Sequence, residues 1–179
     1  MTQTREFGIT VYGATGYTGR LICEYLHSRY GVDGDVKWAM AGRSRAKLEA
    51  VRDEMGIPAS VPLVLADADD LSSIKAMVAN TKVVLTTVGP YQLYGSELVA
   101  QCAAAGTDYV DLCGEPGWMH QMIAQYQAAA KQSGARILFS CGFDSIPFDL
   151  GVLFLQEAAK QRFGAPISSV KGRVRVMKG

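Results

Sequence analysis

The stretch YGATGYTGR, residues 12–20, places Gly13, Gly16 and Gly19 at even spacing directly after the apolar run FGITVY of residues 7–12. A short, apolar and β-branched run is typical of a strand that is buried on both faces. Residues 17–30 follow with apolar side chains at helical spacing. The stretch is therefore predicted to join a first strand to a first helix, the connection at which open parallel sheets hold nucleotide phosphates.

Each residue of this loop has a predicted role. Gly13 can adopt the positive φ of a sharp turn, Gly16 lets a pyrophosphate approach the backbone, and Gly19 lets the helix lie close to the sheet. Thr15 and Thr18 add hydroxyl donors, and the start of the helix adds unpaired N–H groups and the positive end of its dipole. The spacing is GxxGxxG rather than the GxGxxG of the common dinucleotide fingerprint, so a purely structural corner is the alternative.

The rest of the chain alternates strands and helices about six times. Strands are predicted at residues 7–12, 36–41, 61–66, 82–88, 108–112 and 136–140, with helices at 17–30, 44–55, 70–78, 94–105, 118–133 and 148–162. Right-handed crossovers turn this pattern into a Rossmann-type α/β fold, a doubly wound parallel sheet of about six strands with helices on both faces.

Composition narrows the function. The chain has 179 residues, 49% hydrophobic and 20% charged, which suits one globular domain with a real core. A formal net charge of +1 predicts no nucleic-acid partner, and the lack of a long apolar run predicts no membrane span. Two histidines and four widely spaced cysteines predict no metal site and favour a reducing, cytoplasmic location.

The end of the second predicted strand, AGRSRAK at residues 41–47, indicates which dinucleotide is bound. An NAD site usually carries Asp or Glu there, for the ribose 2′-hydroxyl. Here Arg43 and Ser44 occupy the position, and a guanidinium with a hydroxyl at a helix start suits the 2′-phosphate of NADP(H). An ordinary solvated basic helix start is the alternative. Asp67, which ends the third strand, either accepts a hydrogen bond from the adenine amino group or only closes a turn.

Further motifs carry a resemblance to a known family. GATGYTG (13–19), AGRS (41–44), VGPYQLYG (88–95), CAAAGTDYVDLCGE (102–115) and GFDSIPFDLG (142–151) together resemble the saccharopine dehydrogenase-like oxidoreductases. Within that family the chain is most similar to the branch that includes trans-acting enoyl reductases of lipid biosynthesis. The resemblance covers residues 7–151 and implies an N-terminal NADP-binding domain.

The resemblance also implies positions for the parts of the cofactor. The residues concerned are Gly13, Ala14, Thr15, Gly16, Tyr17 and Thr18 for the pyrophosphate, Arg43 and Ser44 for the 2′-phosphate, and Val88, Gly89, Pro90 and Tyr91 for the nicotinamide side.

Polar side chains at the same edge of the sheet are candidates to face a small-molecule substrate, which the resemblance implies is lipid-related. Tyr94 and Asp144 are the candidates chosen, although packing across a loop accounts equally well for Tyr91 and Tyr94. Asp111 follows a strand at this edge too, whereas Glu115 stands at a helix start and is predicted to be a cap. No YxxxK motif occurs, and no catalytic residue is assigned.

Residues 1–164 are predicted to form the NADP-binding domain, and residues 165–179 to begin a second domain that the resemblance implies. Within residues 170–177, three valines (Val170, Val174, Val176) alternate with Lys171, Arg173 and Arg175, which is typical of a half-buried strand. This strand is expected to be disordered or to pair with a second copy in a homodimer, and not to join the parallel sheet. The predicted function is hydride transfer from NADPH to a C=C, C=O or C=N bond. A non-catalytic NADP-binding sensor or scaffold is the alternative.

Overall fold

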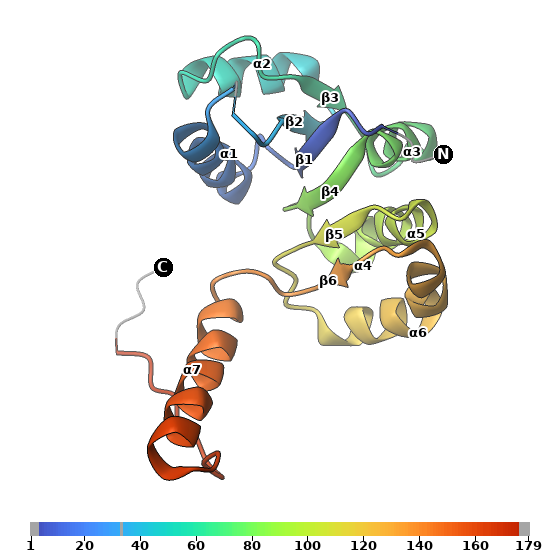
Figure 1. Cartoon of the computed structure of the whole chain (residues 1–179). Helices are drawn as coiled ribbons and strands as arrows, with labels where there is room; N and C mark the ends of the chain where they lie inside the picture. The colour runs from blue at the N-terminus through green and yellow to red at the C-terminus, as the bar shows by residue number, and fades with distance from the viewer. Residues whose placement is uncertain (1–3, 33, 176–179) are drawn as a thin grey trace.

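One parallel sheet organises the chain, and the structure, a computed structural model, describes residues 4–32 and 34–175 (Figure 1). Within these ranges the strands are β1 (Phe7–Tyr12), β2 (Trp38–Gly42), β3 (Leu63–Leu65), β4 (Thr81–Thr86), β5 (Asp108–Val110) and β6 (Ile137–Leu138). They pair in the order β3-β2-β1-β4-β5-β6, and every neighbouring pair is parallel. The predicted doubly wound α/β fold is therefore confirmed.

The helices of the described residues follow the predicted alternation. They are α1 (Tyr17–Tyr30), α2 (Arg45–Glu54), α3 (Leu71–Ala79), α4 (Tyr91–Tyr94), α5 (Ser96–Ala105), α6 (Pro116–Ser133) and α7 (Ile146–Phe163). Ser44 caps α2 by accepting from the N–H of Lys47, and Asp70 caps α3 by accepting from the N–H groups of Ser72 and Ser73. The helix predicted at 94–105 corresponds to α5, which begins at Ser96, and the short helix α4 before it was not predicted.

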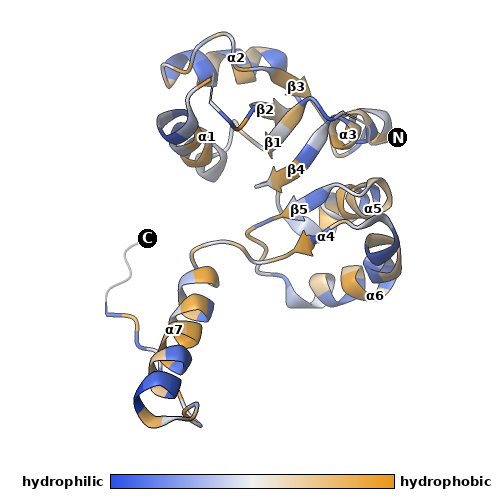
Figure 2. Ribbon diagram, in the orientation of Figure 1, coloured by the Kyte–Doolittle hydropathy of each residue, from blue (hydrophilic) through white to orange (hydrophobic). Residues whose placement is uncertain are grey.

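Helix α7 extends away from the sheet (Figure 1), and Figure 2 shows apolar residues along its length. Phe148, Leu153 and Phe154 are 44%, 55% and 73% exposed, and Ala159 is the buried residue of the helix. A helix that is apolar on several sides and packs on little of its own domain offers a surface for another domain or another molecule.

The segment after α7 contains no strand between residues 165 and 175. Gln156 of α7 holds it through two hydrogen bonds of 2.9 Å with the backbone of Ile167. The strand predicted at 170–177 is therefore wrong for residues 170–175, while residues 176 and 177 lie outside the described ranges. Its alternating pattern needs a neighbouring strand with which to share hydrogen bonds, and the sheet of the described residues does not extend to it.

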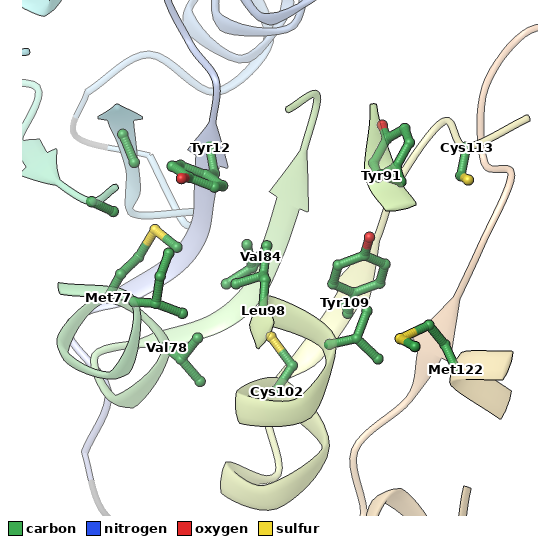
Figure 3. Close-up of a cluster of buried hydrophobic side chains, with 14 of the residues drawn as sticks. Tyr12, Met77, Val78, Val84, Tyr91, Leu98, Cys102, Tyr109, Cys113 and Met122 are labelled. Carbon is green, nitrogen blue, oxygen red and sulfur yellow. The ribbon is translucent and has the colours of Figure 1, made fainter. Parts of the chain in front are cut away.

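The core forms two layers, one on each face of the sheet. Helices α3, α5 and α6 bury one cluster against Val84 and Tyr109 of the central strands, as Figure 3 shows for part of it. Helices α1 and α2 bury a second cluster against β1 and β2, which includes Val11, Met40 and Leu48. Successive side chains along a strand point to opposite faces of the sheet, and this separates the two layers of the core.

The order of strands along the sheet changes direction at β1: β2 and β3 follow on one side of it, and β4, β5 and β6 on the other. Tyr12, the last residue of β1, is aligned with Ala41 of β2 and with Thr86 of β4. The loops that leave β1, β2 and β4 therefore emerge side by side at the carboxyl edge of the sheet, where folds of this type bind their ligands.

Candidate cofactor-binding site

The loop after β1 is a tight turn anchored to both neighbouring strands. Gly13 has a φ of +93°, in the region that favours glycine, and a Cβ atom there would lie 2.6 Å from the Thr87 hydroxyl. The N–H groups of Gly13 and Ala14 donate to the Ala41 carbonyl at 3.0 and 3.1 Å. The N–H of Gly16 then closes the turn by donating to the Gly13 carbonyl at 3.0 Å.

The start of α1 is open to an anion. Its N-cap is Gly16, which makes no side-chain capping hydrogen bond, and the first turn contains no acidic side chain. The first N–H groups of a helix lack acceptors within the helix, and the helix dipole places partial positive charge beside them. Gly16 is exposed, and a Cβ atom there would meet only the Gly13 carbonyl oxygen, at 3.4 Å. Space for a phosphate group therefore remains above this residue.

Gly19 makes the close packing of the loop against α1 possible. A Cβ atom at Gly19 would overlap the carbonyl oxygen of Gly13 and would lie 2.9 Å from the Cα atom of Ala14. The glycines of the loop thus differ in what they allow: Gly13 allows the turn, Gly16 leaves space, and Gly19 brings the helix close.

A cavity of about 400 Å³ opens on the β2–β3 side of this loop and is called here the adenosine-side cavity. It is lined from the carboxyl ends of β1 to β4 by residues that include Gly13, Thr15, Arg43, Asp67, Gly89 and Pro90. Tyr12, Ala68, Asp69, Val88 and Tyr94 also line it. Burial raises the pKa of Tyr12 to about 12, with a further increase from the charge of Asp67, so its phenol stays protonated at neutral pH.

Arg43 and Asp67 line the adenosine-side cavity with polar side chains, whereas Ser44, the residue after Arg43, does not line it. Arg43 is exposed, and among the described residues it has no hydrogen-bond or ion-pair partner, so its guanidinium is free to bind an anion. Ser44 caps α2 at 3.4 Å from the Lys47 nitrogen, which leaves its hydroxyl proton available as a donor. Asp67 accepts from the N–H of Asp69 at 3.2 Å and so retains acceptor capacity toward a ligand.

A second cavity, of about 460 Å³, lies between the start of α1 and the carboxyl ends of β4, β5 and β6; it is called here the β5–β6 cavity. Thr18 and Ile22 of α1 form one wall, and apolar residues such as Leu85 and Val110 of the sheet form another. Asp144 also lines this cavity, and the residues that line it include no lysine, arginine or histidine. The glycine loop and the first turns of α1 therefore contribute to two cavities: Gly13 and Thr15 to the first, Thr18 to the second.

Asp111 is buried in the wall of the β5–β6 cavity and ties the ends of β5 and β6 together. Its carboxylate accepts from the Tyr109 hydroxyl at 2.8 Å and from the N–H groups of Cys113 and Ser140 at 3.0 and 2.7 Å. Burial raises the pKa of Asp111, and these donors oppose the rise. With three donors already bound, Asp111 shapes the wall of the cavity.

The structure decides between the alternatives for Tyr91 and corrects the role expected of Glu115. The Tyr91 side chain is buried and belongs to the apolar cluster of Figure 3. Its hydroxyl donates to the Thr86 carbonyl at 3.3 Å, and its ring centroid lies 5.7 Å from that of Trp118. Of the two alternatives for Tyr91, the structure therefore shows packing. Glu115 makes no side-chain cap for its own helix, α6, and instead accepts from the N–H groups that begin α4.

The remaining candidates are divided between the cavities and their surroundings. Eight line the adenosine-side cavity: Gly13, Thr15, Arg43, Asp67, Val88, Gly89, Pro90 and Tyr94. Thr18 and Asp144 line the β5–β6 cavity. Ala14 is buried under the loop and Tyr17 is 83% exposed, and neither lines either cavity. Tyr12 and Asp69 were not predicted as site residues. Tyr12 ends β1, and Asp69 lies in the loop from β3 to α3 that also holds Asp67. Their positions at the carboxyl edge of the sheet are the signal that could have identified them.

A parallel sheet with this strand order, a glycine-rich turn before an uncapped helix and a free arginine after the second strand define a dinucleotide-binding domain of the Rossmann type. The sequence family described as "Saccharopine dehydrogenase NADP binding domain" matches residues 9–138. The chain belongs to this family and is an NADP-binding domain.

Curated relatives of the chain are longer proteins. A trans-acting enoyl reductase of Mycobacterium ulcerans is 49% identical over 158 residues, which are 88% of this chain and 37% of that protein. A trans-acting enoyl reductase of Mycobacterium tuberculosis is 51% identical over 150 residues, which are 83% of this chain and 35% of that protein. The chain thus spans well under half of the length of the relatives it matches.

Solved structures share the fold at low sequence identity. Apo saccharopine dehydrogenase (L-Glu forming) from Saccharomyces cerevisiae superposes with a TM-score of 0.61 at 17% identity, over 86% of this chain and 32% of that one. Triphenylmethane reductase from Citrobacter sp., complexed with NADP(H), superposes with a TM-score of 0.54 at 19% identity, over 74% and 48% of the two chains.

Proposed function

We propose that this chain is the cofactor-binding part of an NADPH-dependent oxidoreductase that transfers hydride to a C=C, C=O or C=N bond of a small molecule. The observation that carries the proposal is that the glycine loop and the start of α1 border two cavities. A pyrophosphate at the start of α1 would direct one nucleotide toward Arg43 and the other toward the β5–β6 cavity. When bound, NADPH supplies the hydride; the residues of this chain bind it, orient it and shape the cavity beside it.

The residues present fit this cofactor. The open position at Gly16 suits the pyrophosphate, and the unpartnered Arg43 with the Ser44 hydroxyl suits the 2′-phosphate. Thr15 can donate to phosphate oxygens, and Asp67 can accept from the adenine amino group. Val88, Gly89 and Pro90 would line the cofactor on the side of β4.

The β5–β6 cavity supports an uncharged, lipid-related substrate. Its lining contains apolar side chains and two carboxylates, Asp111 and Asp144, with no cationic side chain to pair with an anionic substrate. This agrees with relatives named enoyl reductases. Asp144 from this cavity and Tyr94 from the adenosine-side cavity remain the candidates to face the substrate.

A cytoplasmic location and pairing of two copies are further parts of the proposal. The four cysteines are all free thiols, in keeping with a reducing compartment, and the exposed apolar residues of α7 offer a surface for association. Along the described residues no helix is long and apolar enough to cross a membrane. In the same ranges no three His, Cys, Asp or Glu side chains are grouped as metal ligands.

Oxidation of NADPH in the presence of enoyl thioesters, carbonyl compounds and imines tests the proposed reaction. The chain spans well under half of the length of its relatives. The assay should therefore be made on the chain alone and on the chain joined to the remaining part of an enoyl reductase relative. Turnover in either form supports the oxidoreductase. Tight NADPH binding without turnover in both forms would favour the sensor or scaffold.

Arg43→Ala is expected to weaken NADPH binding by about 1.5–3 kcal/mol, the usual contribution of a charge-assisted contact. NADH binding should barely change, because NADH lacks the 2′-phosphate. Calorimetry with both cofactors on both proteins measures this, and Arg45→Ala, on the first turn of α2 and outside the cavity lining, is the matched control. Equal affinities of the unmodified chain for NADPH and NADH would contradict the assigned role of Arg43.

A further inference from the structure

The loop that follows β4 forms one wall of the adenosine-side cavity with residues Val88, Gly89 and Pro90. Its first end is fixed to the glycine loop: the Thr87 N–H donates to the Tyr12 carbonyl at 2.9 Å, and the Thr87 hydroxyl donates to the Gly13 carbonyl at 3.2 Å. Gly89 and Pro90 are themselves exposed. The position of this wall therefore depends on how its second end, at the start of α4, is held.

Glu115 holds that second end. One carboxylate oxygen accepts from the N–H of Tyr91 at 2.7 Å, and the other accepts from the N–H of Gln92 at 2.9 Å. Both hydrogen bonds are charge-assisted and cross 24 and 23 positions of the sequence. Among the described residues Glu115 has no ion-pair partner, so its carboxylate is committed to these two donors.

The anchor itself is well fixed. Glu115 directly precedes α6, its carbonyl accepts from the Met119 N–H at 3.0 Å, and its own N–H points to the Cys113 sulfur at 3.3 Å. Trp118, one turn further along α6, packs on the Tyr91 ring. The start of α6 therefore contacts and fixes the start of α4 through two hydrogen bonds and one aromatic contact.

We infer that Glu115 is a positioning residue for the cofactor: it holds the 88–90 wall at the distance from the glycine loop that bound NADPH requires. This inference rests on the proposed function. Arg43 and Asp67 follow β2 and β3, and β1 lies between them and β4, so the 88–90 wall stands at the other end of the cavity. Glu115 should therefore affect a whole dinucleotide more than a ligand that occupies only the Arg43 end.

Glu115→Gln tests the inference with little change in side-chain volume. A glutamine amide offers one acceptor oxygen, and its NH₂ group would face the second N–H donor. The dissociation constant for NADPH should rise about tenfold, as expected when a hydrogen bond to a charged group is lost. Adenosine 2′,5′-bisphosphate can occupy the Arg43 end of the cavity alone. Its dissociation constant should change less than about threefold, because Glu115 does not hold that end.

Two further measurements make the test decisive. Amide hydrogen exchange at Tyr91 and Gln92 should accelerate in the Glu115→Gln protein, which shows that the wall has been released. Glu97→Gln is the matched control: Glu97 is exposed on the neighbouring helix α5, and its one side-chain donor among the described residues is Gln101 of the same helix. This control should leave both dissociation constants unchanged.

The inference is overturned if the amides exchange faster while NADPH affinity stays the same, because the released wall would then not matter to the cofactor. It is also overturned if both ligands weaken equally, since that indicates a general loss of structure. Failure of the unmodified chain to bind NADPH is a separate result, seen before any variant is made, and it would remove the proposed function itself.

Discussion

Gly16→Val is expected to abolish NADPH binding while the chain remains folded. The backbone of Gly16 is extended, with φ −78° and ψ 167°, a conformation that valine adopts readily. A Cβ atom there would meet only the Gly13 carbonyl oxygen, at 3.4 Å, so the backbone leaves room for a side chain to start at this position. Its methyl groups would occupy the space above the first N–H groups of α1, which the pyrophosphate needs. A loss of at least about 100-fold in affinity, roughly 3 kcal/mol, is expected.

A graded series separates this steric effect from damage to the fold. Gly16→Ala adds one methyl group and should weaken NADPH binding less than Gly16→Val. The free energy of unfolding of each variant should lie within about 1–2 kcal/mol of that of the unmodified chain, which is the change expected from a poorer N-cap residue. Calorimetric titration and denaturant unfolding measure the two quantities. A valine variant with unchanged stability and normal NADPH affinity would show that the loop is only a structural corner.

The first third of the fold could be predicted closely because its signals are local. The buried run at residues 7–12, the glycines and the amphipathic helix at 17–30 correspond to β1, the loop and α1. The edge strands were less predictable. The apolar run at residues 61–66 continues on both sides of β3, but only residues 63–65 pair with β2. An apolar pattern reports burial, and Val61 and Ala66 are buried without belonging to the strand.

The site was predictable where its residues follow strands. Arg43 and Asp67 come directly after β2 and β3, and parallel strands bring such positions to one edge of the sheet, where both line the same cavity. The role of Glu115 was not predictable in the same way. Its position before a proline favoured a cap on its own helix, yet it binds the start of α4. That contact depends on how α4 and α6 pack, which no local pattern encodes.

The strand predicted at residues 170–177 is wrong over the described residues 170–175 for a related reason. Alternation of valine with basic residues predicts that the two faces of a strand would differ in polarity. A strand forms, however, only when a neighbouring strand completes its hydrogen bonds. Between residues 165 and 175 the described contact is instead the pair of hydrogen bonds between Gln156 and Ile167. A sequence pattern can indicate that a segment suits a sheet without supplying the sheet.

Gly19→Ala is expected to reduce the free energy of unfolding by about 2–3 kcal/mol, the upper part of the usual range for overpacking. The added methyl group would overlap the Gly13 carbonyl oxygen, which is part of a backbone turn and cannot rotate away like a side chain. Either α1 must move outward or the turn must give up its hydrogen bonds to the Ala41 carbonyl and from Gly16. Alanine favours the helix over glycine by about 0.5–1 kcal/mol, which offsets only part of this cost.

Gly117→Ala provides the matched comparison for this last prediction. Gly117 also lies in the first turn of a helix, α6, but a Cβ atom there would meet no atom within 4 Å. The same substitution should therefore be neutral or stabilise the protein by up to about 1 kcal/mol. Denaturant unfolding of both variants isolates the close approach of α1 to the loop as the cause of any difference. If Gly19→Ala proves as harmless as Gly117→Ala, the loop and helix can separate at little cost, and the rigid phosphate-binding corner inferred from their contact does not exist.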